Sequence, residues 1–564
     1  MRSPLASWLS VYQPGWWKAD LTAGATAAAV VIPQAMAYAA VAGLPVEVGL
    51  YCSLAAMLTY PLLGSSRPLS VTTTSAIAML TATEVAAVAS VQPAVSPVAI
   101  AVVLAFLVGA ILLVARLFRL GFLANFISKP VLVGFQAGVG VAIIVGQLKA
   151  VLGVPIGSHS TLGILRDAVS MAPRANGPTV LVAVTGVLLL LGLPRLLPKV
   201  PWALVWVGSS IVAAAVLGLA AHGVRSIGAV PAGLPRLTLP DLALARALAP
   251  GALGIALMSF TESMAAARTF RANDDPPVDA NRELVAIGAV NLASGLVGGM
   301  PAGGGASQTA VADGAGARSQ MAQWVNAGVV LATLLIASRV LSLMPQAALA
   351  AVIIVTGISM IKPAAFDAIA KVRRDELLWA LATVAGVILI GTLNGILVAV
   401  AISLLTLFYQ ANHPPVYALV YDRAADLFRR AAPGETDERF PRLLMLGTEG
   451  RVTFANAETV GDSMRALIAQ TQPDVIVLEC EAIPDIEYTA LLMLIEAEQV
   501  LRQQGIALWL AAINPHLRLV IDRSPLASAL GPERIFASRR KALEAYQARG
   551  TSQASNVTPP PANI

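Results

Sequence analysis

Two short stretches of the sequence place small hydroxyl-bearing or glycine residues just before an apolar segment. Residues 70–75 read SVTTTS, and residues 303–308 read GGGASQ. Ser and Thr are preferred at helix N-termini, and glycine lets backbone approach a ligand closely. The free N–H groups and the partial positive charge of a helix N-terminus attract anions. Two such helix starts that face each other would form an anion site that needs no cationic side chain.

A carboxylate is the second feature that could do chemistry. Glu262 stands at the polar end of a long apolar segment, in MSFTESM at 258–264. Ionisable residues at membrane depth are costly and usually functional. A buried Glu262 could bind and release a proton near neutral pH, or bind Na⁺ as a carboxylate. The alternative is a structural carboxylate paired with Arg268. Glu84, expected near the outer end of its segment, is a weaker candidate.

The elements that position these residues are long apolar segments. The chain has 564 residues, of which 57% are hydrophobic and 12% charged, whereas soluble domains carry about 25% charged residues. A bilayer-spanning helix needs about 20 apolar residues. We predict fourteen segments, near 22–44, 48–63, 72–90, 97–117, 131–152, 178–193, 201–221, 248–267, 283–299, 305–316, 321–341, 346–361, 376–392 and 394–411.

Two of these segments, 72–90 and 305–316, are short and begin with polar residues. Each is the third of seven, which is the pattern of transporters built from inverted repeats whose interrupted helices meet at the membrane midplane. The alternative is that both are ordinary helix starts. Pro33 is expected to interrupt the first segment, because proline removes a backbone donor. Gln34 beside it could then supply hydrogen bonds, and a simple packed kink is the other reading.

Loop charges predict the orientation. With the N-terminus in the cytoplasm, the inside loops hold about twice as many Lys and Arg residues as the outside loops. An even number of crossings leaves both termini cytoplasmic. The abundance of Ala and Arg is typical of a GC-rich bacterium, so we expect a bacterial inner (plasma) membrane protein.

The C-terminal part reads as a soluble α/β domain. Short strand-like runs at 442–446, 451–454, 474–478 and 506–512, the third of them β-branched, alternate with helical patterns at 458–470 and 489–504. The proline-rich end is expected to be disordered. Cys52 and Cys480 offer neither a disulfide framework nor a metal-ligand spacing. The +6 net charge is spread over loops, so no nucleic-acid partner is expected. We find no nucleophile–base pair, phosphate loop or metal cluster, and predict no enzyme activity and no cofactor beyond a coupling ion.

Longer motifs resemble one family. They are ADLTAG at 19–24, IPQAMAYA at 32–39, AGLP at 42–45, GLY at 49–51 and GSSR at 64–67, with NREL at 281–284, GGMP at 298–301 and AGAR at 315–318. They are similar to the SulP family of sulfate permeases and anion transporters, and 440–548 resembles its cytoplasmic STAS domain. The resemblance implies a core and a gate domain in two inverted repeats, an elevator-like cycle and a homodimer.

The apolar segments, the change in composition near Phe440 and this resemblance together predict the domain boundaries. We expect a transmembrane domain at 1–412 with repeats at 20–222 and 245–412, a linker at 413–439, the STAS-like domain at 440–548 and a disordered tail at 549–564. The family often has arginine where this chain has Gln308, and Gly-Pro where it has Thr72-Thr73. The first difference removes a cation and the second adds hydroxyl groups, so both bear on which anion is bound.

The leading prediction is proton-coupled uptake of a small oxyanion, with sulfate as the first choice and Glu262 as the proton carrier. The residues predicted to hold the anion or to let the backbone approach it are Gln34, Tyr38, Thr73, Thr74, Ser75, Ala306, Ser307 and Gln308, with Gly299, Gly303 and Gly305. One alternative is Na⁺-coupled bicarbonate or dicarboxylate transport. Another is an anion sensor that signals to a cytoplasmic partner through the STAS-like domain, with Thr489 as a phosphorylation site or, more simply, a helix-start residue.

Overall fold

The computed structural model describes residues 8–9, 12–125, 128–158, 160–197, 200–228, 233–272, 275–422, 425–431 and 440–554. It divides into two compact units, Met1–Ser403 and Leu404–Ile564. We call them the membrane unit and the soluble unit and describe each by itself.

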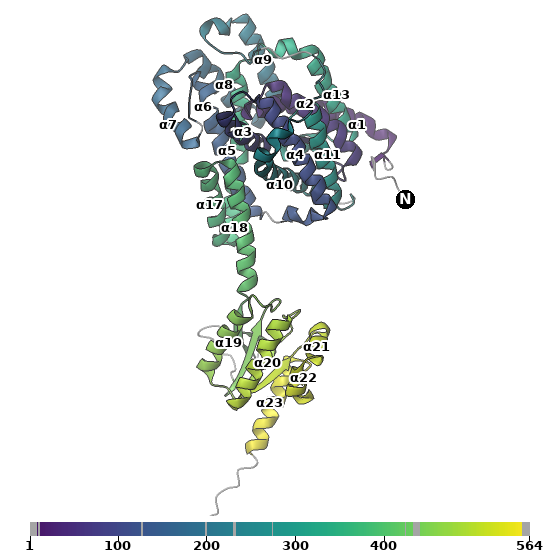
Figure 1. Ribbon diagram of the computed structural model, residues 1–564, viewed down its shortest axis with the longest axis vertical. Coiled ribbons are helices and arrows are strands. Elements are labelled where there is room, and N and C mark those ends of the chain that lie inside the picture. Colours follow the sequence, from purple (N-terminus) through teal and green to yellow (C-terminus); the bar gives the residue numbers. More distant parts are fainter. Residues whose placement is uncertain are drawn as a thin grey trace, which may run out of the picture. The chain divides into compact units, whose positions relative to one another are not determined.

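The membrane unit is built of helices (Figure 1). Each of the fourteen predicted segments overlaps a helix: α1 (Trp17–Val41), α2 (Val46–Leu63), α3 (Ser75–Val91), α4 (Pro97–Leu117), α5 (Lys129–Gly146), α8 (Gly177–Leu196), α9 (Trp202–Val216), α10 (Ala245–Thr269), α11 (Ala280–Leu296), α12 (Ala306–Gly314), α13 (Met321–Ala332), α15 (Gln346–Met360), α17 (Arg374–Ile390) and α18 (Thr392–Asn412), the last of which continues past Ser403. Shorter helices are α6 (Leu148–Leu152), α7 (Thr161–Met171), α14 (Ser338–Leu341) and α16 (Pro363–Val372).

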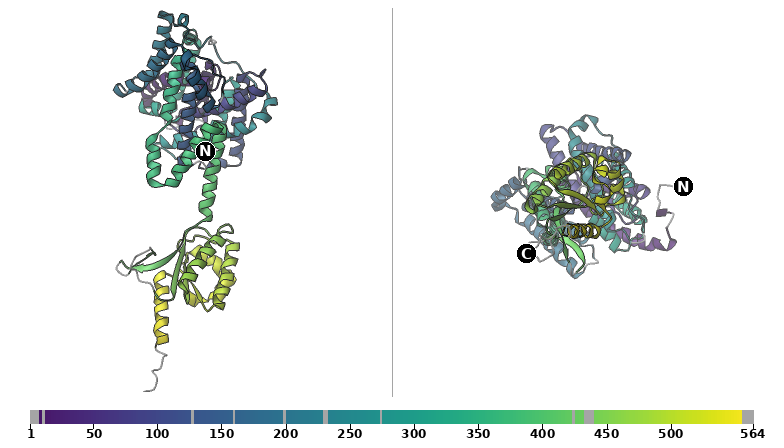
Figure 2. Two further views of the ribbon diagram at one scale, coloured as in Figure 1. Left: turned by 90° about the vertical axis from the view of Figure 1, so that its left-hand side faces the viewer. Right: turned by 90° about the horizontal axis from the view of Figure 1, so that it is seen from below.

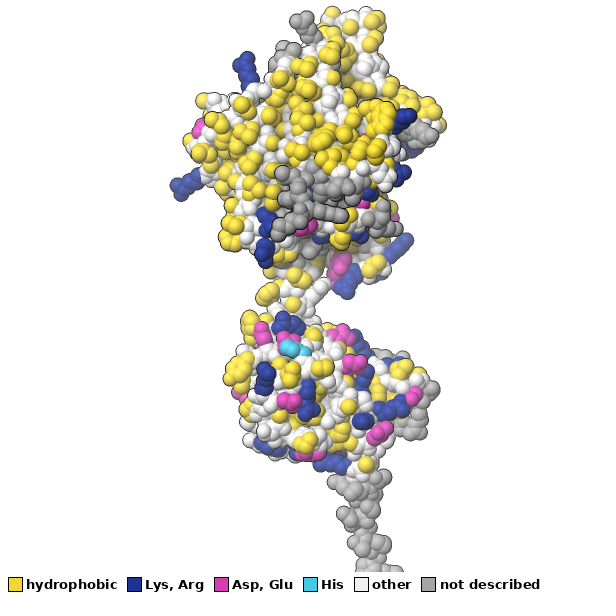
Figure 3. Space-filling model, turned by 90° about the vertical axis from the view of Figure 1, so that its right-hand side faces the viewer, with side chains coloured by type: hydrophobic (Ala, Val, Ile, Leu, Met, Phe, Trp, Pro, Cys, Tyr) yellow, Lys and Arg dark blue, Asp and Glu magenta, His cyan; other side chains and the backbone are white. Residues whose placement is uncertain are grey.

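Seven helices in the described residues are long and apolar enough to cross a membrane by length and composition. Hydrophobic side chains spread over a broad surface of the membrane unit, whereas charged side chains are scattered over the soluble unit (Figure 3). This difference agrees with a lipid-facing surface on the first unit. The predicted interruption at Pro33 is wrong, because α1 continues through this proline to Val41.

Small residues let the helices of the membrane unit pack closely. One group contains α1, α2, α4, α10, α11 and α13, and another contains α5, α8, α15 and α17. A Cβ added to Gly109 of α4 would lie 2.8 Å from the Gly288 carbonyl oxygen of α11. A Cβ added to Gly134 of α5 would lie 2.2 Å from the Ala380 carbonyl oxygen of α17. Such close backbone contacts stabilise helix pairs in lipid, where the hydrophobic effect does not hold them together.

Two very short strands join the two halves of the membrane unit. β1 (Val71–Thr72) directly precedes α3, and β2 (Gly303–Gly304) directly precedes α12. They pair antiparallel, with Val71 opposite Gly304 and Thr72 opposite Gly303. All four residues are buried, and the pairing satisfies backbone groups that would otherwise lack a partner there.

The soluble unit has a six-stranded sheet in the order β4-β3-β5-β6-β7-β8. The strands are β3 (Val416–Asp422), β4 (Leu427–Arg430), β5 (Leu443–Thr448), β6 (Val475–Glu479), β7 (Ala507–Ala511) and β8 (Ile535–Phe536), and the helices are α19 (Ala457–Thr471), α20 (Tyr488–Gln503), α21 (Pro515–Asp522), α22 (Pro525–Leu530) and α23 (Arg539–Ala554). Strands β5 to β8 are parallel, and β3 pairs antiparallel with β4 and β5. Helices α20 and α21 pack against one sheet face and α23 against the other (Figure 2).

Three predictions about this part need correction. The expected linker at 413–439 contains β3 and β4, because its alternating aromatic and aliphatic residues extend the sheet. The strand expected at 451–454 is reduced to one bridge between Val452 and Ile486. The tail expected at 549–564 begins as helix, because α23 continues to Ala554; residues 555–564 lie outside the described part of the chain.

Candidate anion site

The pairing of β1 with β2 brings the two predicted helix starts together. The Gly305 N–H donates to the Ser70 carbonyl oxygen at 3.0 Å, and the Ser70 N–H donates to Thr309 Oγ1 at 3.0 Å. From α10, Ser263 Oγ accepts from the Gly304 N–H at 2.7 Å and donates to the Ser259 carbonyl oxygen at 2.6 Å. The starts of α3 and α12 are thus fixed to each other and to α10.

The start of α3 is connected to the predicted proton carrier. Thr74 is the N-cap residue, and its Oγ1 accepts from the Ile77 N–H at 3.4 Å. The same hydroxyl donates to Glu262 Oε2 of α10 at 2.7 Å. Thr74 therefore links the helix start to the only carboxylate that sequence reasoning assigned to this site.

The start of α12 contributes an amide side chain. Gln308 is 1% exposed and its Nε2 donates to the Thr73 carbonyl oxygen at 3.4 Å. Gln308 Oε1 and Thr73 Oγ1 are buried without a hydrogen-bond partner among the described residues. Ala306 and Ser307 are exposed, and the first N–H groups of a helix have no acceptor within it. Unused polar groups therefore gather where α3 and α12 begin.

Helix α1 and the end of α15 complete this group of residues. The Tyr38 hydroxyl lies against the side chains of Ser75 and Thr356, close to Glu262. Ser75 Oγ also donates to Met360 Sδ at 3.2 Å. Gln34 Oε1 is buried without a partner in the described residues. Thr356 and Met360 were not predicted, because a Thr and a Met at the end of an apolar helix carry no signal of their own.

The three predicted glycines pack against the protein's own atoms. A Cβ on Gly299 would lie 2.4 Å from Ser294 Oγ, and one on Gly303 would lie 2.6 Å from Ile77 Cδ1. A Cβ on Gly305 would lie 2.3 Å from Gln308 Oε1. Backbone atoms crowd Gly299 most, with the Ser294 carbonyl oxygen 2.9 Å from its added Cβ, whereas the atoms nearest Gly303 and Gly305 are the ends of flexible side chains. The approach of an anion to these glycines stays a prediction.

A second carboxylate holds the segment that leads into β1. Glu283 of α11 accepts from the Tyr60 hydroxyl at 3.0 Å, and from the N–H and hydroxyl of Ser65, each at 2.7 Å. A buried carboxylate needs such donors to remain in place. Glu283 lies within the NREL motif, for which sequence reasoning gave no role.

Thr489 lies in the soluble unit and is exposed as the second residue of α20, whose N-cap residue is Glu487. The preceding loop is fixed by Asp485, which pairs with Arg451 at 2.6 Å and with His516 at 3.4 Å. Burial alone would raise the pKa of Asp485, but the hydrogen bond and charge of Arg451 together with His516 hold that pKa below its ordinary value. Thr489 takes no part in these contacts, and its phosphorylation stays a prediction.

Comparison with known proteins identifies the family. Residues 17–383 match the sulfate permease family and residues 436–542 match the STAS domain. The chain belongs to the sulfate permease family. It is 35% identical to a probable sulfate transporter of Mycobacterium tuberculosis over 542 aligned residues. The alignment covers 95% of this chain and 97% of that relative. The predicted family, the transporter class instead of an enzyme, and the STAS domain are thereby confirmed.

Two solved structures share the fold. The murine Solute Carrier 26 family member A9 anion transporter, in its inward-facing state, superposes with a TM-score of 0.85 at 20% identity, covering 96% of this chain and 93% of that one. The transmembrane domain of the cyanobacterial bicarbonate transporter BicA gives a TM-score of 0.59 at 22% identity, covering 70% of this chain and 98% of that domain. At these identities the likeness concerns the fold alone, and it confirms the predicted helical transporter architecture with its STAS domain.

Proposed function

We propose that this sulfate permease family member takes up a small oxyanion together with protons, and that sulfate is its substrate. The observation that supports this most is the contact between Thr74 and Glu262, at 2.7 Å, beside the paired starts of α3 and α12. The 35% identical mycobacterial relative, named as a probable sulfate transporter, supports the choice of sulfate.

The anion is bound by polar groups that the protein leaves unused. N–H groups at the starts of α3 and α12, together with the Thr73 hydroxyl and the Gln308 amide, surround it. Gln34 and Tyr38 line the site from α1, and Gly299, Gly303 and Gly305 keep the surrounding backbone close. Neutral donors bind the oxyanion without a permanent cation, so release on the other side requires no ion pair to be broken.

The coupling follows from the charge of Glu262. An ionised carboxylate repels an anion at the start of α3, whereas the protonated acid donates a hydrogen bond and carries no charge. Anion and proton therefore bind together and leave together. A chain that binds both is a symporter, and no further cofactor is needed.

The transport cycle is elevator-like. The group of helices around α1, α10 and α12 carries the site and moves against the group around α5, α8 and α17. The transporter is a homodimer in a bacterial inner membrane. Both of its termini lie in the cytoplasm, as the loop charges predict. The cytoplasmic STAS domain offers a surface to a protein partner.

The test is flux in proteoliposomes. Purified protein is reconstituted, and uptake of radiolabelled sulfate is followed with and without an inwardly directed proton gradient at fixed membrane potential. We expect uptake that the gradient drives and that unlabelled sulfate inhibits more strongly than bicarbonate or dicarboxylates. Gradient-independent uptake would contradict proton coupling, and the absence of any anion flux would favour the sensor hypothesis.

Sodium coupling is the second candidate, because Thr261 Oγ1, one residue before Glu262 in the sequence, is buried without a partner among the described residues. Oxygen ligands of this kind suit a hard cation. Uptake into the same vesicles distinguishes the two hypotheses. If uptake requires Na⁺ at every pH, then Na⁺ is the coupled ion instead of the proton, and bicarbonate and dicarboxylates are again candidate substrates.

A further inference from the structure

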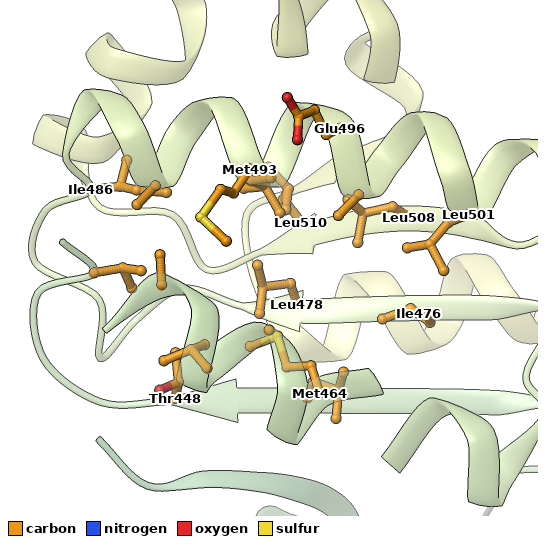
Figure 4. Close-up of a pocket in the computed structure, with 18 of the residues that line it drawn as sticks. Thr448, Met464, Ile476, Leu478, Ile486, Met493, Glu496, Leu501, Leu508 and Leu510 are labelled. Atoms are coloured by element: carbon orange, nitrogen blue, oxygen red, sulfur yellow. The ribbon is translucent and has the colours of Figure 1, made fainter. Parts of the chain in front are cut away.

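A large apolar cavity lies inside the soluble unit, between the sheet and helices α19 and α20 (Figure 4). Its volume is about 610 Å³. Leu446, Leu478 and Leu510 line it from three neighbouring strands and form the floor. Met464 and Met493 face this floor from the two helices. Small-molecule sites in proteins have volumes of about 300–1,000 Å³ and are mostly apolar. This cavity has the size and lining of a ligand site, and it plays no part in the proposed transport step.

The cavity extends over the length of β6. Ile476 and Cys480, near opposite ends of β6, both line it, and four residues of a strand span about 13 Å. An extended alkyl chain can lie along this length. The flexible side chains of Met464 and Met493 can adjust to an alkyl chain, because methionine adapts to irregular apolar surfaces.

The lining selects against a charged ligand. Its charged side chains are Arg465 and Glu496, which have opposite signs and lie on the exposed surfaces of α19 and α20. Arg465 is paired with Asp462, and Figure 4 shows the Glu496 carboxylate directed away from the sheet. The buried lining is therefore neutral, and an ionised head group would be buried there without a partner.

One polar group inside the cavity lacks a partner. Thr448, at the end of β5, lines the cavity and is 1% exposed. Its Oγ1 has no hydrogen-bond partner among the described residues. Buried hydroxyl groups are nearly always hydrogen-bonded, because leaving one unpaired is costly. A ligand with one neutral polar group would satisfy it.

We propose that the STAS domain of this chain binds a single-chain neutral lipid in this cavity. The ligand has an unbranched alkyl or acyl chain that lies on the leucine floor. It carries a hydroxyl or carbonyl group that forms a hydrogen bond with Thr448 Oγ1. Fatty alcohols and monoacylglycerols share this chemistry.

Photo-crosslinking on the full chain in lipid nanodiscs tests the proposal. The probe is a 1-decanol analogue with a diazirine in its chain, and labelled peptides are mapped by mass spectrometry. We expect saturable labelling of peptides from α19 and α20, displaced by 1-decanol. The 1-decanol should compete about five-fold better than decane, because decane cannot form the hydrogen bond. Monodecanoylglycerol is the second competitor, and decanoate should compete poorly because of its charge.

Two variants locate the site. Ala497→Trp places an indole at the mouth of the cavity and should reduce labelling of α19 and α20 at least ten-fold, whereas Gln499→Trp, on an exposed part of the same helix outside the lining, should not. Thr448→Val should make 1-decanol and decane compete equally. Labelling that does not saturate, or that persists in Ala497→Trp, would overturn the proposal. Equally strong competition by decane in the parent protein would overturn the role of Thr448.

Discussion

Replacing Glu262 with glutamine separates proton coupling from anion binding. The amide has the size of the carboxyl group and can still accept the hydrogen bond from Thr74, which lies 2.7 Å away. It cannot exchange a proton. At an effective dielectric constant of about 20 and a separation of about 5 Å, an ionised Glu262 would repel a monovalent anion by about 3 kcal/mol and sulfate by about 7 kcal/mol. The substitution removes this repulsion.

The assay compares accumulation with exchange in proteoliposomes. Each coupled proton adds about 1.4 kcal/mol per pH unit, which corresponds to an approximately tenfold accumulation ratio. We expect the Glu262→Gln variant to lose accumulation driven by a one-unit gradient but to retain sulfate–sulfate exchange. Its apparent affinity for sulfate should also stay constant with rising pH, whereas that of the parent should fall.

The matched control is Glu84→Gln. Glu84 is also buried in the membrane unit, and its carboxyl group packs against Gly251 of α10. This variant should accumulate sulfate as the parent does. If Glu262→Gln still accumulates sulfate about tenfold under the gradient, or if Glu84→Gln loses accumulation equally, the reasoning that assigns the proton to Glu262 is refuted.

Three further outcomes follow from the geometry. Gln308→Arg adds a cation at the start of α12, so it should lower the KM for sulfate about tenfold and the KM for nitrate by a smaller factor. Initial uptake rates measure both KM values. An equal change for the two anions would contradict a charge effect. Gly304→Ala places a Cβ 2.8 Å from the Ser263 Cα and should lower the free energy of unfolding by about 1–3 kcal/mol. The control Gly328→Ala has open space at its Cβ and should leave the free energy of unfolding unchanged. Melting temperatures of the two variants test this difference. Because its pKa is depressed, ionised Asp485 stabilises the soluble unit at neutral pH, and this contribution is lost as the pH falls below about 4. Asp485→Asn should therefore cost less than about 1 kcal/mol at pH 7, since the Arg451 side chain of the ion pair is 63% exposed and water screens the pair. The variant should lack this residue's part of the acid-induced loss of stability, as calorimetry on the full chain would show.

Hydrophobic patterning predicted the fold well because bilayer-spanning helices are long and apolar. Even the two short helices were found, since SVTTTS and GGGASQ mark helix starts, and the structure places α3 from Ser75 and α12 from Ala306. The soluble unit was harder. Strand β3 (Val416–Asp422) follows a long apolar helix directly, so its short alternating pattern did not stand out from a linker.

The candidate site was predictable only where a residue type carries a signal. A carboxylate in an apolar segment drew attention to Glu262, but its contact with Thr74 depends on how α3 packs against α10. The pairing of β1 with β2 was not foreseen, because two glycines have no strand propensity and the partners are far apart in sequence. Thr356 joins the site only because α15 ends beside Tyr38.

The β1–β2 pairing also dictates the order in which this protein can be assembled. During synthesis, Val71 and Thr72 enter the membrane long before Gly303 and Gly304 have been made. Until then their backbone groups have no strand partner, and unpaired backbone is costly in lipid. We therefore expect the first half to mature only when the second half inserts beside it. A ribosome-stalled chain ending before β2 should then be more sensitive to proteases around residues 70–75 than the finished protein, because closing so long a loop is a late event in folding.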